Sequence, residues 1–416
     1  MYHMVQNTSV KVIKNAYLID GTGKMPVKDA TIIIKGNTIE ELGKTLDAPR
    51  GAEMINADGK TVMPGLIDAH VHICSNGDAN IMSALSYTPG LVQLFGAHNA
   101  AKTLDAGYTM IRDMGAPSGF ALSLKKAIEM GVAKGPRIVA PGRIISMTGG
   151  HADFYLPSGI GYNEMSLISD GPVETRRSAR INLREGADFI KICTTGGVMS
   201  PTDPVDTPQL TVEEIEAVCD EAHHVGKFVA SHAHGPKGIM NAIIGGVKSI
   251  EHGSIQTSET VKAMVEHDVF QVPTLTASWN IVTKGTAAGI PDWAVNKAQE
   301  IVEYPPKSLM LCHRAGVKVA AGTDAGTPFN RHGENAKELE LMVAAGLKPI
   351  EAITCATKIG AEACWLGAKT GTVEKGKWAD LIIVDGHPTA DIKLLQDKAK
   401  IRLVMKAGNI EVNRGI

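Results

Sequence analysis

The stretch GLIDAHVHICS, residues 65–75, predicts a strand that runs through an apolar interior and ends in two histidines. Because alternate residues of a strand point to the same face, His70 and His72 are expected to project side by side. Two interpretations compete for such a pair. The rings are either hydrogen-bonded core side chains or ligands of a metal ion, and other segments of the chain must distinguish the two.

The middle of the chain repeats this strand pattern. Seven further apolar segments are expected to be strands: YTMIRDM (108–114), RIVAPGRII (137–145), DFIKICTT (188–195), KFVASHAH (227–234), KSIEHG (248–253), FQVPTL (270–275) and VKVAAGTD (317–324). Helical patterns such as VEEIEAVCDEAHHVG (212–226) separate them. Eight strand–helix units predict an α/β fold, a closed (β/α)8 TIM barrel. A doubly wound open sheet is the alternative, but the glycine-rich nucleotide loop expected after its first strand is missing.

The two ends of the chain carry a different pattern. Short strands with turn signals are expected in VKVIKNAYLID (10–20), ATIIIKGNTIEELG (30–43) and AEMINADGKTVMPG (52–65). Similar strands are expected in GTVEKGKWADLIIVDG (371–386) and IRLVMKAGNIEVN (401–413). We therefore predict a small β-sandwich domain built from residues 1–62 and 369–416, with the barrel between them at 63–368.

The composition limits the classes of partner. The 416 residues are 44% hydrophobic and 21% charged, with a formal net charge of -2, which is ordinary for a globular protein. This balance gives no basic surface for nucleic acid or for an anionic membrane. Aromatic residues make up only 4%, too few for platforms on which bases stack. Neither nucleic acid nor a membrane is therefore expected as a partner.

The N-terminal residues and the cysteines suggest a location. MYHMVQNTSVKVIKNAYLID (1–20) has no apolar core of signal-peptide length, and no apolar run is long enough to span a bilayer. The six cysteines are scattered and form no Cys-x-x-Cys pair. Free thiols in a reducing cytoplasm are the expectation.

Titratable side chains gather where five of the eight expected strands end. In a barrel of this kind, the functional groups lie at the C-terminal ends of several strands. Imidazole nitrogen and carboxylate oxygen are ligands of zinc and similar divalent ions. The pattern therefore predicts a metal site made from His70 and His72, Lys191, His232 and His234, His252, and Asp324.

Lys191 and Asp324 each have a second interpretation. Burial lowers the pKa of a lysine, and a neutral amine reacts with carbon dioxide to give a carbamate that can bridge two metals. Alternatively, the head of Lys191 reaches the rim and pairs with an acid. The second interpretation of Asp324 is that it caps a helix, as an aspartate after Gly-Thr often does. The loop sequence AGTP (325–328) after it instead favours a functional role.

This combination of residues resembles the amidohydrolase superfamily over nearly the whole chain. The flanks GKTVMPGLIDAHVH (59–72) and GTVEKGKWADLIIVDG (371–386) resemble those of the superfamily. The segments SMTGGHADF (146–154), KICTTGGVMSPTDPV (191–205), SHAHG (231–235) and IEHG (250–253) are similar to the imidazolonepropionase-related branch. That branch contains metal-dependent Xaa-Pro dipeptidases, Arg/Lys carboxypeptidases and ochratoxin-hydrolysing amidases.

The resemblance implies two zinc ions per chain and a homo-oligomer, often an octamer. The implied ligands are His70, His72 and Asp324 for the inner metal, His232 and His252 for the outer metal, and a carboxylated Lys191 that bridges both.

Two further histidines are assigned to the substrate. Geometry does not choose between His232 and His234 as the metal ligand, because they share a strand face, and the resemblance favours His232. His234 stands where related enzymes often have tyrosine, and we expect it to face the substrate and stabilise the oxyanion. His151 is expected to hold the substrate carboxylate, with Asp153 orienting it. The alternative role for His151 is to order its loop.

These assignments predict a hydrolase that cleaves the amide bond to a C-terminal amino acid in dipeptides or N-acyl amino acids, as prolidases, carboxypeptidases or ochratoxin amidases do. A hydroxide shared by the metals would attack, and Asp324 would carry its proton to the leaving amine. One alternative is a one-metal cyclic-amide hydrolase, imidazolonepropionase-like, or a deaminase. The other is a catalytically silent binding or assembly protein, which would have lost a ligand.

The specificity of the site is left open by the sequence. The insertions 153–165 and 276–293 are expected to roof the site. The side chains considered able to reach the substrate are Arg143, Tyr155, Tyr162, Trp279 and Arg331.

Overall fold

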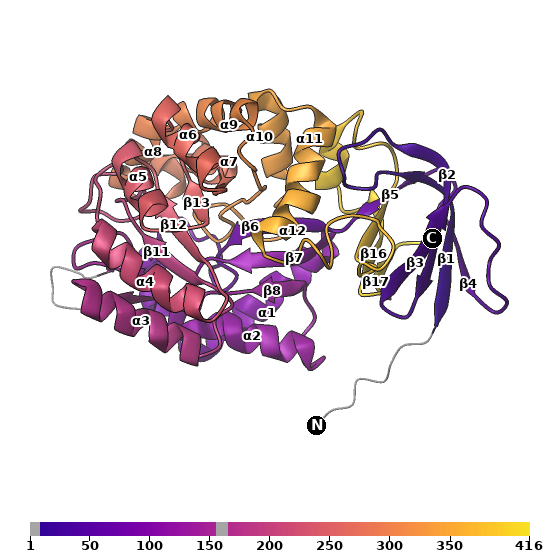
Figure 1. Cartoon of the computed structure of the whole chain (residues 1–416), viewed down its shortest axis with the longest axis horizontal. Helices are drawn as coiled ribbons and strands as arrows, with labels where there is room; N and C mark the ends of the chain where they lie inside the picture. The colour runs from indigo at the N-terminus through magenta and orange to yellow at the C-terminus, as the bar shows by residue number, and fades with distance from the viewer. Residues whose placement is uncertain (1–8, 155–164) are drawn as a thin grey trace.

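The computed structural model describes residues 9–154 and 165–416, and it pairs the two ends of the chain (Figure 1). Eight strands form one sheet in the order β17-β16-β15-β5-β1-β2-β3, with β4 beside β1. The N-terminal strands are β1 (Val10–Leu18), β2 (Val27–Lys35), β3 (Thr38–Gly43), β4 (Glu53–Asn56) and β5 (Thr61–Pro64). The C-terminal strands are β15 (Leu381–Val384), β16 (Ile401–Lys406) and β17 (Asn409–Asn413).

The two ends meet where β15 pairs antiparallel with β5, so that Ile383 lies opposite Val62. Branched side chains such as Ile32 and Ile34 are fully buried in the core of this sheet. Branched residues of this kind favour pleated, half-buried backbone. The expected boundary between residues 62 and 63 falls inside β5, and the domain limits stay predictions.

The middle of the chain forms two parallel sheets. The three-stranded sheet has the order β6-β7-β8, and the six-stranded sheet has the order β10-β9-β11-β12-β13-β14. The first contains β6 (Leu66–Val71), β7 (Tyr108–Asp113) and β8 (Arg137–Val139). The second contains β9 (Ile144–Ser146), β10 (Ser166–Ile168), β11 (Ile190–Cys193), β12 (Val229–Ala233), β13 (Ser249–His252) and β14 (Phe270–Val272).

The third expected strand, residues 137–145, is in fact two short strands, β8 and β9, which belong to different sheets. Pro141 and Gly142 lie between them. Proline has no N–H to donate to a ladder, and Gly142 has a φ of 79°, which bends the chain. The prediction of a continuous strand here was wrong because these two residues interrupt the pairing.

The eighth expected strand, residues 317–324, is not a regular strand but bridges the two sheets. On one side the Gln271 amide donates to the Lys318 carbonyl at 3.0 Å. On the other side the Ala69 amide donates to the Ala321 carbonyl at 2.9 Å. The segment therefore lies between β14 and β6, and it positions Asp324 beside the end of β6.

Helices surround the parallel strands and are connected to them in alternation (Figure 1). The first group is α1 (Pro89–Asp105), α2 (Phe120–Glu129), α3 (Pro172–Arg184), α4 (Val212–His224), α5 (Pro236–Ile244) and α6 (Ser258–Glu266). The second is α7 (Leu275–Lys284), α8 (Asp292–Ile301), α9 (Tyr304–Ala315), α10 (Lys337–Ala345), α11 (Pro349–Thr354) and α12 (Gly360–Ala363). The short helical turns within the described residues are η1 (Ile81–Ser86), η2 (Pro117–Gly119), η3 (Thr286–Ala288), η4 (Cys355–Ile359) and η5 (Ile392–Gln396).

Helix starts follow local sequence signals. Thr211 and Glu214 form a capping box at α4, in which each side chain accepts a hydrogen bond from the backbone of the other residue.

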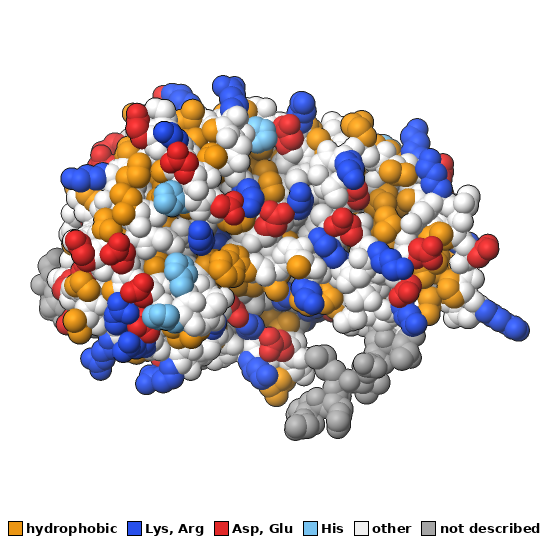
Figure 2. Space-filling model, viewed as in Figure 1, with side chains coloured by type: hydrophobic (Ala, Val, Ile, Leu, Met, Phe, Trp, Pro, Cys, Tyr) orange, Lys and Arg blue, Asp and Glu red, His pale blue; other side chains and the backbone are white. Residues whose placement is uncertain are grey.

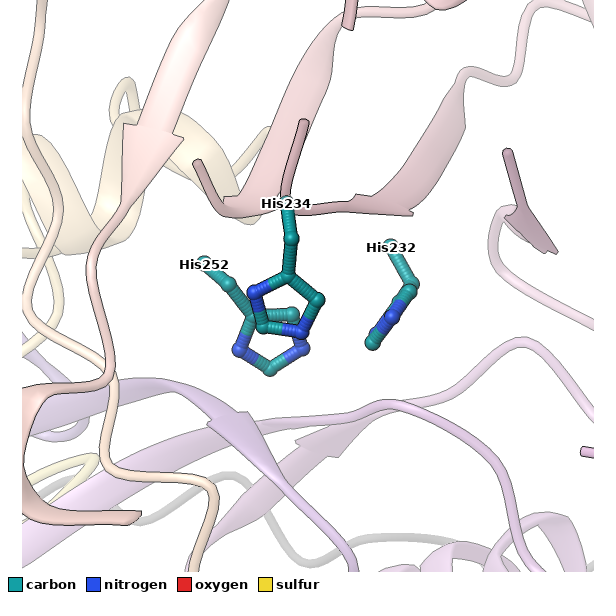
Figure 3. Close-up of side chains that lie close together, drawn as sticks. All are labelled: His232, His234 and His252. Atoms are coloured by element: carbon teal, nitrogen blue, oxygen red, sulfur yellow. The ribbon is translucent and has the colours of Figure 1, made fainter. Parts of the chain in front are cut away.

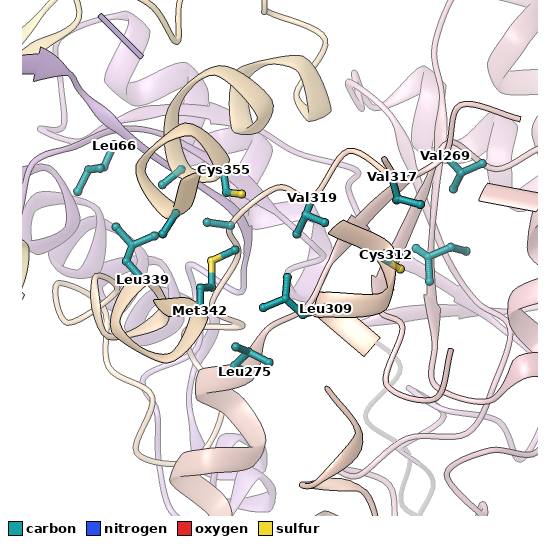
Figure 4. Packing of buried hydrophobic residues seen from close by; sticks show 14 of the residues in the cluster. Leu66, Val269, Leu275, Leu309, Cys312, Val317, Val319, Leu339, Met342 and Cys355 are labelled. Carbon is teal, nitrogen blue, oxygen red and sulfur yellow. The ribbon is translucent and has the colours of Figure 1, made fainter. Parts of the chain in front are cut away.

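The apolar faces of these helices pack on the strands. Figure 4 shows this core where Leu309 and Cys312 of α9 lie near Val319.

The surface facing the viewer in Figure 2 mixes acidic, basic and apolar side chains without a large area of one kind. No helix in the described ranges has the length and apolar character needed to cross a membrane.

Candidate active site

Five histidines from three strands of the two parallel sheets meet at one end of those sheets. His70 lies in β6, and His72 follows that strand directly. His232 lies in β12, His234 follows it, and His252 ends β13. The His232 ring centroid is 4.7 Å from that of His234 and 4.6 Å from that of His252 (Figure 3). The structure therefore brings together the five histidines that were predicted from the sequence to lie at one site.

Two overlapping groups of potential metal ligands result. The ligand atoms of each group lie within 4.8 Å of one another, and all these residues are buried. One group is His232, His234 and His252, and the other is His70, His252 and Asp324. His72 joins the second group at its edge, because its Nε2 is 3.4 Å from Asp324 Oδ1.

Each of the five rings has one nitrogen tied to a fixed partner. A carbonyl or carboxylate oxygen only accepts hydrogen bonds, so the ring nitrogen facing it carries the proton and the other nitrogen keeps a lone pair for a metal. The distances are 2.8 Å from His70 Nδ1 to Glu251, 2.9 Å from His72 Nδ1 to the Gly115 carbonyl, 2.9 Å from His232 Nε2 to the Gly196 carbonyl, 2.7 Å from His234 Nδ1 to Ser254 Oγ, and 2.7 Å from His252 Nδ1 to Thr274 Oγ1.

The carboxylate of Asp324 completes this arrangement. Its Oδ1 is buried without a hydrogen-bond partner among the described residues, although it lies 3.4 Å from Nε2 of both His70 and His72. When both rings are neutral and carry their proton on Nδ1, the three facing atoms all present lone pairs. A bound cation would satisfy all three at once, so the residues present fit a divalent metal ion.

Lys191 lies among these ligands and is 2% exposed. No hydrogen bond or ion pair joins its Nζ to a residue in 9–154 or 165–416, so the pairing with an acid at the rim is not seen. Burial lowers the pKa of Lys191 despite the nearby carboxylates of Glu251 and Asp324. The neutral amine that carbamate formation requires is therefore more accessible than in water.

Burial also keeps most of the site histidines neutral. It lowers the pKa of His72 to about 4 and that of His234 to about 3, and it holds those of His232 and His252 well below their ordinary value. Burial opposes the charged form of Asp324 as well, but His70 and His72 outweigh it and lower the pKa of this carboxyl. His70 is the exception, because burial opposes its charged form but Asp324 and Glu251 outweigh burial and raise the pKa of its ring. Neutral imidazoles beside an ionised carboxylate are the forms that bind metal, so a metal ion here would displace any second proton on His70.

The backbone is strained at three positions of the site. His252, Thr274 and Asp324 have φ values of 67°, 49° and 61°, in the left-handed region that non-glycine residues seldom adopt. Such conformations cost on the order of 1–3 kcal/mol each and concentrate at functional sites. Here they aim His252 and Asp324 at the same point and bring Thr274 to His252.

Sequence reasoning missed the buried ion pair between Glu251 and Arg112, which lies behind His70. Glu251 and Arg112 are both fully buried, and Arg112 Nη2 donates to Glu251 Oε1 at 2.9 Å. Burial opposes the charge on Glu251, but Arg112 and His70 outweigh it and lower the pKa of this carboxyl to about 2. A permanent carboxylate therefore orients His70. An acid in IEHG and an arginine in YTMIRDM, both inside apolar strands, were the available signals.

Glu251→Gln is expected to weaken metal binding by about 10–100-fold, because the amide no longer fixes the His70 ring as a carboxylate does. It also leaves Arg112 without its counter-charge, so thermal stability should fall. Metal affinity is measured by titration with a competing chelator. Glu214→Gln, which changes a carboxylate of the α4 capping box, is the control and should leave affinity unchanged. Equal affinities in both variants would contradict a positioning role for Glu251.

His151 lies beside the site and stacks on His232, with ring centroids 4.1 Å apart. The expectation that Asp153 orients it was wrong, because that carboxylate accepts a hydrogen bond from the Gly149 amide instead. Ser200 Oγ lies 2.7 Å from His151 Nδ1 and takes this role. A Cβ at Gly197 would come within 2.3 Å of the His151 ring, so glycine is required there for the stacking.

The cavity around these residues encloses about 930 Å³ with its open mouth, a volume typical of small-molecule sites. Residues of the cavity wall include His151, Lys191, His234 and Asp324.

The side chains thought able to reach the substrate do not line the described part of this cavity. Arg143 pairs with Glu185 at 3.1 Å, while Trp279 and Arg331 border a separate hollow. Tyr155 and Tyr162 lie outside the described residues.

Comparisons with known proteins agree with this geometry. The model of the Amidohydrolase family matches residues 61–410, and the chain belongs to this family. Ochratoxinase from Aspergillus niger is 32% identical, over 98% of this chain and 88% of that protein. Imidazolonepropionase from Symbiobacterium thermophilum is 22% identical, over 97% and 93%. The solved structure of a Xaa-Pro dipeptidase with bound methionine is 34% identical, with a TM-score of 0.90 over 97% of this chain and 99% of that one.

The family resemblance expected from the sequence is therefore confirmed, and the chain is a hydrolase that acts on amide or peptide C–N bonds. The α/β fold with parallel sheets is confirmed as well. The roles of the individual site residues stay predictions.

Proposed function

We propose that this hydrolase uses two zinc ions and cleaves the amide bond to a C-terminal amino acid in dipeptides or N-acyl amino acids. The observation that carries the proposal is the orphaned Oδ1 of Asp324, which lies 3.4 Å from Nε2 of both His70 and His72. The proposed ligands are His70, His72 and Asp324 for one ion, His232 and His252 for the other, and a carboxylated Lys191 between them. The Xaa-Pro dipeptidase and ochratoxinase relatives support this substrate class.

Two divalent metals bound here would lower the pKa of a water molecule towards ~7 and polarise the scissile carbonyl. Asp324 accepts the proton of the attacking water and delivers it to the leaving amine, which an amide needs in order to depart. His234 donates from its ring to the developing oxyanion. Nε2 of His151 donates to the carboxylate of the leaving amino acid, while Ser200 holds Nδ1.

The proposal extends to the scaffold and its setting. The strands from β6 to β14, with residues 317–324, close into a (β/α)8 barrel, and the sheet built from both chain ends folds into a sandwich. All six cysteines are free and buried, which supports a reducing cytoplasm. A homo-oligomer and a small-molecule substrate complete the proposal.

The test is metal content and hydrolysis of a substrate panel on the purified protein. We expect about two zinc ions per chain. Xaa-Pro, Xaa-Arg and N-acyl amino acids should be hydrolysed, and prolonged treatment with a chelator should abolish the activity until zinc is restored. About one ion per chain, with turnover of cyclic amides or deamination instead, would overturn the proposal.

A further inference from the structure

A second cavity adjoins the site and shares part of its wall. Five residues line both cavities: Ser75, Ile81, Phe154, Met165 and Gly326. We call this second cavity the side chamber, and it encloses about 720 Å³ with its mouth. Because the walls are shared, one small molecule can lie with its reacting bond at the histidines and one end in the side chamber.

The walls of the side chamber are mainly apolar. Met82 and Leu85 of η1, together with the Tyr87 and Phe95 rings, form much of its surface, and these two rings pack edge to face 5.4 Å apart. No lysine, arginine or histidine stands among its described lining residues. Its one acid, Asp78, accepts a hydrogen bond from the Tyr87 hydroxyl at 2.9 Å. An apolar group would gain more from this environment than a charged one.

The position of the side chamber suits it to the acyl end of the substrate. Its wall includes Ser75 and Gly326, which follow His72 and Asp324 closely along the chain. His151 stacks on His232 and lines the first cavity, but it does not line the side chamber. A substrate whose terminal carboxylate reaches His151 would therefore extend its acyl end past Asp324 into the side chamber.

We propose that the side chamber binds the acyl side of the substrate and selects a large apolar group, aromatic or long aliphatic. The preferred substrates are then N-acyl amino acids or dipeptides in which this group precedes the scissile bond. The inference rests on the proposed amide hydrolysis and adds the identity of the acyl group. A basic acyl group would bury a charge against the apolar wall. A very small acyl group would leave that wall unfilled.

The test uses matched substrates that share one leaving amino acid and differ only in the acyl group: phenylacetyl, hexanoyl, acetyl and lysyl. The wild-type kcat/KM should be at least about tenfold higher for phenylacetyl and hexanoyl than for acetyl or lysyl. Ala84→Phe places a ring on the chamber wall from a partly exposed turn. It should lower the phenylacetyl value at least about tenfold and leave the acetyl value within about twofold.

Leu94→Phe is the control, since Leu94 is 68% exposed on α1 and does not line the chamber. It should change neither value. Met82→Ala enlarges the chamber and should shift the preference towards larger acyl groups, which serves as a second test if Ala84→Phe does not fold. A wild-type preference for acetyl or lysyl, or an equal loss on both substrates in Ala84→Phe, would overturn the inference while amide hydrolysis stands.

Hydrolysis of none of the amides would instead overturn the proposed function. Direct binding then tests the chamber by itself. Calorimetric titration should show tighter binding of phenylacetate than of acetate to the wild type, with the difference lost in Ala84→Phe. Equal binding of the two acids by the wild type would overturn the side chamber as an apolar subsite.

Discussion

Asp324→Asn is expected to lower kcat/KM for amide hydrolysis by about 10³-fold, a loss of about 4 kcal/mol in transition-state stabilisation. Asp324 is the carboxylate that faces both His70 and His72, and its Oδ1 has no hydrogen-bond partner among the described residues. Asparagine keeps the shape of the side chain but its amide cannot take up and return a proton at neutral pH. The measurement is steady-state kinetics on the best substrate of the panel.

Metal content and thermal stability of the same variant separate the two parts that Asp324 is proposed to play. Metal content close to that of the wild type, with the activity lost, assigns the loss to proton transfer. Parallel loss of metal and activity assigns it to ligation. Asp153→Asn is the matched control, because the described residues give that carboxylate a hydrogen bond from the Gly149 amide and none to the site. The activity of this variant should stay within about twofold. Activity of Asp324→Asn within about tenfold of wild type, or ~1.4 kcal/mol, would show that the acid/base role is wrong.

The sequence predicted which histidines would lie close together, because strand alternation and strand ends are local signals. His70 with His72, and His232 with His234, follow from a period of two, and the parallel strands bring their C-terminal ends together. The prediction needed no knowledge of loops. It therefore succeeded for residues whose positions are fixed by the strands themselves.

Predictions outside the strands were less successful, because they depend on contacts between distant segments. Asp153 lies two residues from His151, yet Ser200, which is 49 residues away, supplies the contact. Arg143 was considered for the substrate, but Glu185, which directly follows α3, binds it instead. Neither pairing has a sequence signature, since each arises only when separate loops pack together.

The Glu251–Arg112 pair illustrates a different limit. Each residue alone is an unexplained charge in an apolar strand, and the pairing becomes visible only when β7 and β13 are both placed around the same interior. Burying two charges is costly unless they are paired and hydrogen-bonded, so a buried charge in a strand predicts a partner without naming it. The same reasoning favours a chemical modification of Lys191, such as the proposed carbamate, because its amine is buried and has no such partner within the described ranges.

Lys191→Ala is expected to reduce zinc from about two ions per chain to one or fewer and to abolish amide hydrolysis. Alanine removes the amine that the proposal places between the two ligand sets. Because the described structure gives Lys191 no ion pair to lose, the variant should remain folded, with a melting temperature close to that of the metal-free wild type. Lys125→Ala, which removes a lysine paired with Asp188 away from the site, is the control and should keep its full metal content.

Carbamate formation is tested separately from the presence of the lysine. It joins the Lys191 nitrogen to the carbon of carbon dioxide and releases one proton, and it requires the neutral amine that burial favours. Metal-free wild type should therefore recover its second ion and its activity faster with bicarbonate than in buffer freed of carbon dioxide, whereas Lys191→Ala should show no such difference. If the wild type recovers equally in both buffers and Lys191→Ala retains two ions, Lys191 is a structural residue and the bridged site is wrong.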